Sequence, residues 1–162
     1  MTYIKTATLH LRPRMPVIAR LCLLAALAFA ATTGAQTMPQ KLPAISLGVG
    51  IYLINAEVAQ TPDQRAIGLM NRPTMGVSDG MLFAFEAGAT QCFWMKNTLL
   101  PLSIAFIGDD GAIVNIIEMK PQSLESHCST KPVRFALEMN QGWFAKRGIK
   151  AGSKLTGQPW PK

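Results

Sequence analysis

The stretch CFWMKNTLLP, residues 92–101, contains the side chains of this sequence that are best suited to bind a ligand. Trp94, Lys96 and Asn97 follow one another closely in it. A tryptophan beside a cation can line a pocket, because the ring stacks on a ligand while the cation attracts negative charge. The stretch therefore predicts part of a binding surface.

The spacing within this stretch predicts which side chains face the interior, since successive side chains of a strand point to opposite faces of a sheet. A strand from Cys92 would place Cys92, Trp94 and Lys96 on one face and Phe93, Met95 and Asn97 on the other. We expect Phe93 and Met95 in the core, with Trp94 and Lys96 sharing a surface. A buried Trp94 with the Lys96 stem lying along it is an open alternative.

One acidic residue stands in an apolar setting. Glu138 lies between Leu137 and Met139, and a carboxylate there needs a partner if it is buried. The candidate partners are Lys96, Arg65 and Arg72. A pair between Lys96 and Glu138 would be either a structural ion pair or an acid and base with shifted pKa values. The full set of candidate ligand-binding residues is Arg65, Arg72, Trp94, Lys96, Asn97 and Glu138.

The sequence contains no recognisable catalytic motif. No serine, histidine and acid form a nucleophile motif, and no glycine-rich phosphate loop is present. We therefore assign no catalytic residue and expect no cofactor. Seven methionines after residue 35 could supply thioether ligands for copper, but they are scattered among aliphatic residues, which favours core packing.

The N-terminus has the pattern of an export signal. Four basic residues precede the apolar run LCLLAALAFAA, residues 21–31, and a small residue follows at Ala35. This order is typical of a secretory signal peptide, here over residues 1–35. The apolar run is shorter than the ~20 residues of a membrane-spanning helix, which favours cleavage over an uncleaved anchor. We expect a periplasmic or secreted protein without stable membrane insertion after cleavage.

Two cysteines remain after residue 35, Cys92 and Cys128. An exported protein most simply pairs them in a disulfide, which the chain-entropy relation values at ~3 to 4 kcal/mol. His127 adjoins Cys128, so a metal site or a redox site is an open alternative. These three residues lack the close C-x-x-C spacing of a strong metal motif, and we assign no metal ligand.

The charge argues against a nucleic-acid partner. The formal net charge is +7, but four of the 16 Lys and Arg and none of the nine Asp and Glu lie in residues 1–35. The remaining chain has 12 basic and nine acidic residues, a net charge of +3. It has no basic run and no basic residues interleaved with aromatics. We expect a monomer whose partner is a small polar or anionic ligand.

The length after the leader indicates one domain. Residues 36–162 suffice for a single core and contain no internal repeat or linker. The proline-containing ends, residues 36–44 and TGQPWPK at 156–162, are predicted to be arms. The expected organisation is a signal peptide over 1–35, an N-terminal arm over 36–44 and a single domain over 45–162.

The local patterns predict short strands and two short helices. TPDQ, residues 61–64, combines an N-cap, a proline at the first helical position and a capping-box glutamine, so a helix is predicted to about residue 70. A second helix is predicted over 140–148. Strands are predicted over 50–59, 80–85, 133–139 and 153–157, and apolar runs around GDDG predict a hairpin over 101–119. The predicted fold is mainly β (α+β), a compact curled sheet that is barrel-like or sandwich-like.

Several segments, taken in order, resemble the family called domain of unknown function 192. They are EVAQTPDQRAIGLMNR, GMLFAF, FWMKNTLLPLSIAFI, DDGAIVNI and ALEMNQGWF, and they cover about residues 57–155. The positions that match the family pattern are Arg65, Gly68, Leu69, Met70, Arg72, Gly80, Met81, Phe83, Phe93, Trp94, Met95, Lys96, Asn97, Thr98, Pro101, Glu138 and Gly142. The resemblance implies a compact, mostly β, often exported bacterial or archaeal domain with no established activity. It does not imply the disulfide, because many members lack these cysteines.

Three functions agree with these observations. The first is an exported binding or accessory domain whose ligand, such as a glycan or a small acid, carries negative charge or hydroxyl groups. The second is a hydrolase or transferase that uses Lys96 and Glu138. The third is a copper or redox accessory protein that uses Cys92, His127, Cys128 and the methionines.

Overall fold

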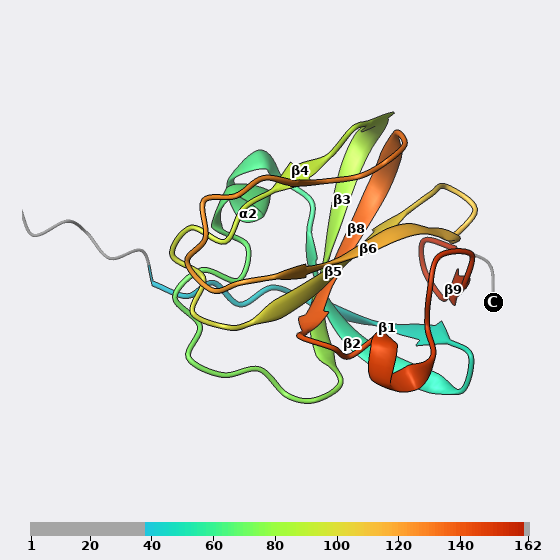
Figure 1. Cartoon of the computed structure of the whole chain (residues 1–162), viewed down its shortest axis with the longest axis horizontal. Helices are drawn as coiled ribbons and strands as arrows, with labels where there is room; N and C mark the ends of the chain where they lie inside the picture. The colour runs from blue at the N-terminus through green and yellow to red at the C-terminus, as the bar shows by residue number, and fades with distance from the viewer. Residues whose placement is uncertain (1–37, 161–162) are drawn as a thin grey trace, which may run out of the picture. The chain divides into compact units, whose positions relative to one another are not determined.

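The computed structural model describes residues 38–160. Its main feature is a seven-stranded sheet in the order β6-β5-β8-β3-β2-β1-β9 (Figure 1), accompanied by a two-stranded ribbon of β4 and β7. The strands are β1 (Ala44–Val49), β2 (Tyr52–Ala59), β3 (Asp79–Ala89), β4 (Cys92–Phe93), β5 (Leu102–Ile107), β6 (Ile113–Met119), β7 (His127–Cys128), β8 (Val133–Asn140) and β9 (Leu155–Thr156). The helical elements are α2 (Pro62–Ile67) and the 3-10 turn η2 (Ala145–Arg147).

The sheet is strongly curled, as Figure 1 shows by the crossing of β3 and β8 over β1 and β2. All its strand pairs are antiparallel except β2 with β3. A parallel pair needs a crossover connection. Here that connection is residues 60–78, which contain α2. The prediction of a mainly β, curled sheet is confirmed.

The sheet carries a hydrophobic cluster on each face. Alternate residues of β3 divide between them: Leu82 joins one cluster, while Met81 and Phe83 join the other. Every residue of β5 is buried, which agrees with the apolar hairpin sequence around GDDG. The cluster that contains Met81 and Phe83 is called the Met81 cluster below, and Ala136 of β8 belongs to it. Because side chains alternate along a strand, Glu138 of β8 lies on the same face as Ala136.

The predicted capping of α2 is confirmed. The Thr61 hydroxyl accepts a hydrogen bond from the Gln64 amide at 3.2 Å, and the Gln64 side chain accepts one from the Thr61 amide at 3.1 Å. The helix ends at Ile67, earlier than the predicted residue 70. The chain turns away there because Gly68 adopts a φ of 49°, a conformation that favours glycine.

The helix predicted over 140–148 forms only in its last part, as a 3-10 turn that stops at Gly148 as expected, and its predicted start at Asn140 was wrong. Asn140 is instead the last residue of β8, and its side-chain amide donates to the Gly76 carbonyl at 2.8 Å rather than capping a helix. The segment that follows forms turns and the single 3-10 turn η2, which ends at Gly148 with a φ of 68°.

The C-terminal end of the described region packs more closely than an arm would. Trp160 is 4% exposed, and its ring centroid lies 4.8 Å from that of Phe135. The prediction of a C-terminal arm was therefore wrong at this residue. At the other end, the sequence analysis missed β1, which forms a hairpin with β2 through a turn at Gly50. No helix within residues 38–160 is long and apolar enough to cross a membrane.

Candidate ligand cleft

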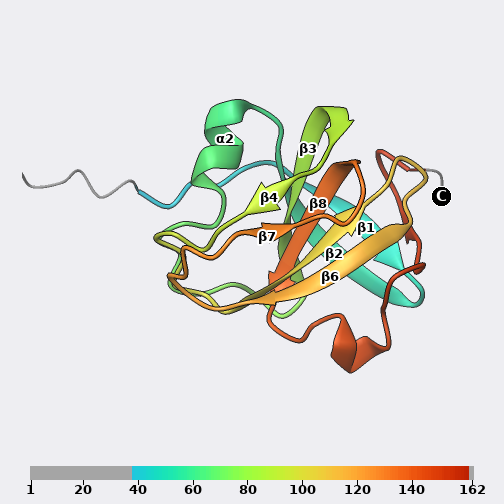
Figure 2. The same ribbon diagram turned by 45° about the horizontal axis from the view of Figure 1, so that its top comes forward.

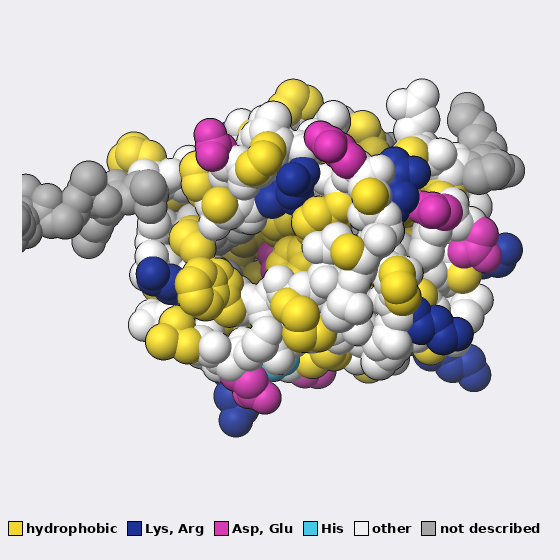
Figure 3. Space-filling view, turned by 90° about the horizontal axis from the view of Figure 1, so that it is seen from above, with side chains coloured by type: hydrophobic (Ala, Val, Ile, Leu, Met, Phe, Trp, Pro, Cys, Tyr) yellow, Lys and Arg dark blue, Asp and Glu magenta, His cyan; other side chains and the backbone are white. Residues whose placement is uncertain are grey.

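A cleft of about 380 Å³ opens beside α2 and β4, on the side of the sheet that holds the Met81 cluster. Figure 2 shows α2 beside β4, with β7 next to β4. Seen from above, this face is hollowed, with hydrophobic side chains around the opening and an acidic side chain visible inside (Figure 3). Apolar side chains from α2, β3 and β4 form most of the lining. The polar side chains of the lining are Arg65, Gln91, Thr98 and Glu138.

Glu138 contributes a buried carboxyl to this cleft. It is 4% exposed and pairs across the sheet with Met81 on one side and Ile104 on the other. Within residues 38–160 its side chain has no hydrogen bond and no ion pair. Burial raises the pKa of the Glu138 carboxyl from its ordinary value of 4.5 to about 8. The carboxyl is therefore mostly protonated at neutral pH and can donate a hydrogen bond.

Arg65 supplies the cation of the cleft wall. Its Nη1 donates hydrogen bonds to the carbonyl oxygens of Gln60 and, at 2.9 Å, Ala84. Its guanidinium carbon lies 4.9 Å from the centre of the Phe85 ring. No carboxylate of the described region lies within ion-pair distance of Arg65. The guanidinium is thus oriented by carbonyls and a ring, and its charge is not compensated by an acid.

Trp94 lies at the edge of the cleft and is 52% exposed. The Lys96 ammonium lies 5.3 Å from the Trp94 ring centre. Phe93 and Met95 point inward and Trp94 and Lys96 outward, as the alternation predicts. Asn97 departs from it and is exposed, because the strand has already given way to a turn.

That turn explains why Asn97 stands at its position. The Thr98 amide donates to the Met95 carbonyl at 3.0 Å, and Asn97 has a φ of 56°, which asparagine tolerates better than most residues. Its own carbonyl accepts a hydrogen bond from the Asn71 amide at 2.8 Å. Asn97 and Lys96 do not line the cleft.

Arg72 is paired with a different acid from the one considered in the sequence analysis. Its Nη1 and Nη2 bind the two carboxylate oxygens of Glu57 at 2.7 and 2.6 Å. Arg72 and Glu57 lie on a separate surface hollow. The structure therefore brings together Arg65, Trp94 and Glu138, and leaves Arg72, Lys96 and Asn97 outside the cleft. The pair between Lys96 and Glu138 does not form.

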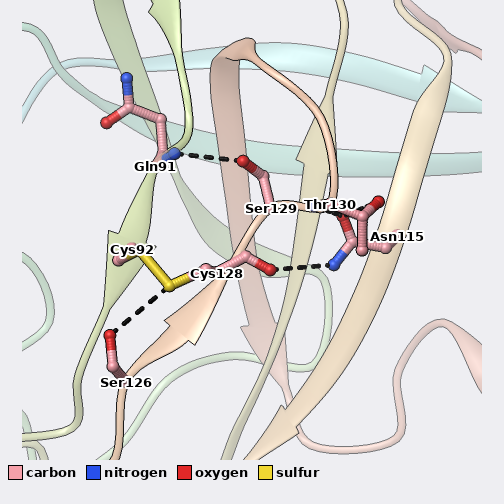
Figure 4. The surroundings of a disulfide bond; sticks show 7 residues. All are labelled: Gln91, Cys92, Asn115, Ser126, Cys128, Ser129 and Thr130. Atoms are coloured by element: carbon pink, nitrogen blue, oxygen red, sulfur yellow. Dashed lines mark hydrogen bonds between the residues drawn. A yellow bond between two sulfur atoms is a disulfide. The ribbon is translucent and has the colours of Figure 1, made fainter.

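The predicted disulfide between Cys92 and Cys128 is present, and it joins β4 to β7 (Figure 4). Hydrogen bonds hold the ribbon in place: the Gln91 backbone amide donates to the Ser129 hydroxyl at 3.1 Å, and the Asn115 side-chain amide donates to the Cys128 carbonyl at 3.3 Å. Since Cys92 lines the cleft and Phe93 and Trp94 follow it, the disulfide stabilises one wall of the site.

The structure offers little for the copper hypothesis. Both sulfurs are joined to each other, and residues 38–160 contain no group of three His, Cys, Asp or Glu that could hold a metal ion. Four methionines are fully buried, as expected of core packing: Met81, Met95, Met119 and Met139.

The aromatic lining from β3 was not predicted from the sequence. Phe83 and Phe85 are two residues apart and face the cleft together with Phe93 of β4. Their ring centroids lie 4.9 and 6.3 Å from that of Phe93. The alternation within GMLFAF was the available signal that Phe83 and Phe85 share a face, but nothing local predicted that β4 would cover it.

Comparison with known proteins places the chain in a family. Residues 47–157 match DUF192, whose members are described as uncharacterised, and the chain belongs to this family. No protein of curated function matches the chain.

Two solved structures are similar to it. One, from Sinorhizobium meliloti 1021, is described as a candidate transcription regulator. It is 34% identical with a TM-score of 0.67, over 73% of this chain and 98% of that one. The other, a protein of unknown function from Novosphingobium aromaticivorans DSM 12444, is 31% identical with a TM-score of 0.69, over 79% of this chain and 99% of that one.

Proposed function

We propose that this protein is an exported binding or accessory domain whose cleft takes a small ligand with hydroxyl or acid groups. The observation that carries the proposal is Glu138, a buried carboxyl that faces a cleft without a hydrogen-bond or ion-pair partner among residues 38–160. A carboxyl that lines a cleft without a protein partner is available to form a hydrogen bond with a ligand.

The size and lining of the cleft agree with this function. Its volume of about 380 Å³ is at the lower end of the range for small-molecule sites, which are mostly apolar with a few polar groups. Trp94 at the edge adds a half-exposed ring of the kind that stacks on flat ligands. The same lining would not suit nucleic acid or a large polar partner.

A plugged cleft provides the test. Ala66 of α2 is exposed and lines the cleft, so Ala66→Trp should fill the opening without disturbing the core. Ala145→Trp is the matched control, because Ala145 is also exposed but lies away from the cleft. A panel of small acids, sugars and aromatic compounds is screened by thermal shift and calorimetry. We expect a compound that binds the parent and Ala145→Trp but not Ala66→Trp. The proposal fails if no compound distinguishes them.

Export is part of the proposal and rests on the leader pattern of residues 1–35. The mature chain would begin near Gln36 in the periplasm or outside the cell. Intact mass of protein from the periplasmic fraction gives the start site. Full-length protein recovered from the membrane fraction would contradict export with cleavage.

An enzyme is the second candidate, because a carboxyl with a raised pKa in an apolar cleft can act as a general acid or base. The expected partnership with Lys96 has no support, so Glu138 would act alone or with Arg65. Hydrolysis of ester, phosphate and glycoside substrates that is lost in Glu138→Gln would favour this candidate. Binding without turnover would favour the first one.

A further inference from the structure

We infer that the ligand is a small organic anion with an apolar body, which places its anionic group at Arg65, its body against the phenylalanines and a hydrogen bond on Glu138. The inference rests on the proposed function and specifies its ligand. It selects an amphiphilic acid rather than a glycan.

The first reason is the uncompensated charge of Arg65. The described region contains three ion pairs, and none includes this guanidinium. Both hydrogen bonds of the Arg65 side chain use Nη1, which leaves donors on Nη2 and Nε for a ligand. A carboxylate is the partner that a guanidinium fork binds best, through charge-assisted hydrogen bonds.

The second reason is the apolar wall of the cleft. The lining has polar side-chain groups on Arg65, Gln91, Thr98 and Glu138 and on the indole N–H of Trp94. Beside them, Phe83, Phe85 and Phe93 offer an apolar surface against which the body of a ligand can pack, with neighbouring rings in edge-to-face contact.

The third reason is the protonation of Glu138. A protonated carboxyl adds no negative charge to the cleft and can donate to an oxygen of the ligand. Few charged or titratable groups lie near Glu138. Its cross-strand neighbours Met81 and Ile104 are apolar, and Arg65 is the only other charged residue that lines the cleft. Since burial raises its pKa to about 8, the carboxyl ionises as the pH rises further. It then repels an anion, so affinity for the ligand should fall.

Phenylacetate and phenylacetamide are suitable probes, because they share an apolar ring and differ in charge. Binding is measured by calorimetry at about pH 6.5, with glucose as a polar neutral comparison. We expect phenylacetate to bind at least about tenfold more tightly than phenylacetamide, the effect of one charged hydrogen-bonded contact. Between about pH 6.5 and about pH 9.5 the affinity for phenylacetate should fall about tenfold or more.

Variants assign the effect to residues. Arg65→Gln should bring the ratio of the two affinities close to one, whereas Arg65→Lys should retain a preference for the acid. Lys150→Gln, which removes an exposed cation outside the cleft, is the matched control and should change neither affinity. Glu138→Gln keeps a neutral hydrogen-bonding group, so it should bind phenylacetate at about pH 9.5 as well as at about pH 6.5.

The outcomes separate this inference from the proposed function. Equal or tighter binding of phenylacetamide or glucose in the cleft would overturn the anion while leaving a binding domain. An acid preference that survives in Arg65→Gln would also overturn it. Should Arg65→Gln not fold, the preference of the parent and the pH response of Glu138→Gln decide. If neither probe binds but a neutral compound of the screen distinguishes Ala66→Trp, only the anion is wrong, whereas another acid that does so through Arg65 would support it. If no compound does, both proposals fail.

Discussion

Arg72 holds Glu57 with two parallel hydrogen bonds, Nη1 to Oε1 at 2.7 Å and Nη2 to Oε2 at 2.6 Å. Both side chains are 14% exposed. The same guanidinium donates to the Gln40 carbonyl at 2.6 Å, and Glu57 also accepts from the Leu42 amide at 2.7 Å. The pair thus fastens the segment before β1 and the loop after α2 to strand β2.

Loss of this pair should destabilise the protein strongly. Arg72→Gln leaves the Glu57 carboxylate largely buried without its partner, and we expect a loss of about 3 kcal/mol in the free energy of unfolding. Lys154→Gln is the control, because Lys154 and Asp110 form an exposed pair at 3.4 Å that should contribute little to stability. Urea unfolding of both variants measures the difference. Equal small losses would mean that the Arg72 pair does not stabilise the fold.

The same pair predicts a loss of stability in acid. Burial alone would raise the pKa of Glu57, but hydrogen bonds from Arg72 and the Leu42 amide outweigh it and lower the pKa below its ordinary value of 4.5. Stability from Glu57 is therefore present above pH 4.5 and is lost as the pH falls through the lower folded-state pKa. Unfolding measured from neutral to acid pH should show this loss in the parent and not in Glu57→Gln.

Glu138 predicts the opposite dependence on pH. Its carboxyl ionises near 4.5 when unfolded and near 8 when folded, so stability is full below the first value and falls as pH rises towards the second. The slope is on the order of 1 kcal/mol per pH unit. Glu138→Gln should lose this slope and exceed the parent in stability above about pH 8. Glu86→Gln, at an exposed acid, is the control. A constant difference between parent and Glu138→Gln at every pH would contradict the prediction.

Lys96 should contribute little to stability. Its ammonium rests over the half-exposed Trp94 ring and has no carboxylate partner in the described region, so Lys96→Ala should cost about 1 kcal/mol or less. Denaturant unfolding measures this. A loss of about 3 kcal/mol or more, the value for a broken buried pair, would mean that Lys96 supports the fold.

Reduction of the disulfide should affect both stability and the cleft. Cys92 and Cys128 are 36 residues apart, a loop length for which the chain-entropy relation gives about 3 to 4 kcal/mol. The double variant Cys92→Ser, Cys128→Ser should lose this amount. Because Phe93 and Trp94 follow Cys92 directly, ligand binding should weaken as well. Thiol titration of the parent should find no free cysteine, and two reactive thiols would contradict the pairing.

Local sequence patterns by themselves determined much of the secondary structure of this protein and the faces on which many side chains lie. The N-cap and capping box of α2 follow from TPDQ, since these contacts lie within one turn of chain. The fully apolar β5 predicts a strand covered on both faces. The two cysteines after residue 35 predicted the disulfide. Alternation in the FWMKNT block placed Phe93 and Met95 inside, and it failed at Asn97, which lies in the turn after β4.

Only the tertiary structure decided which charged groups meet. The alternation of side chains along a strand predicts the face on which each side chain lies, but it does not predict which strand or loop covers that face. Glu138 therefore had three plausible cations, whereas the strand order surrounds it with Met81 and Ile104 and leaves it unpaired. Arg72 reaches Glu57 because the crossover from β2 to β3 brings its loop back beside β2. The cleft exists because the ribbon of β4 and β7 covers β3, a long-range contact that no local pattern encodes.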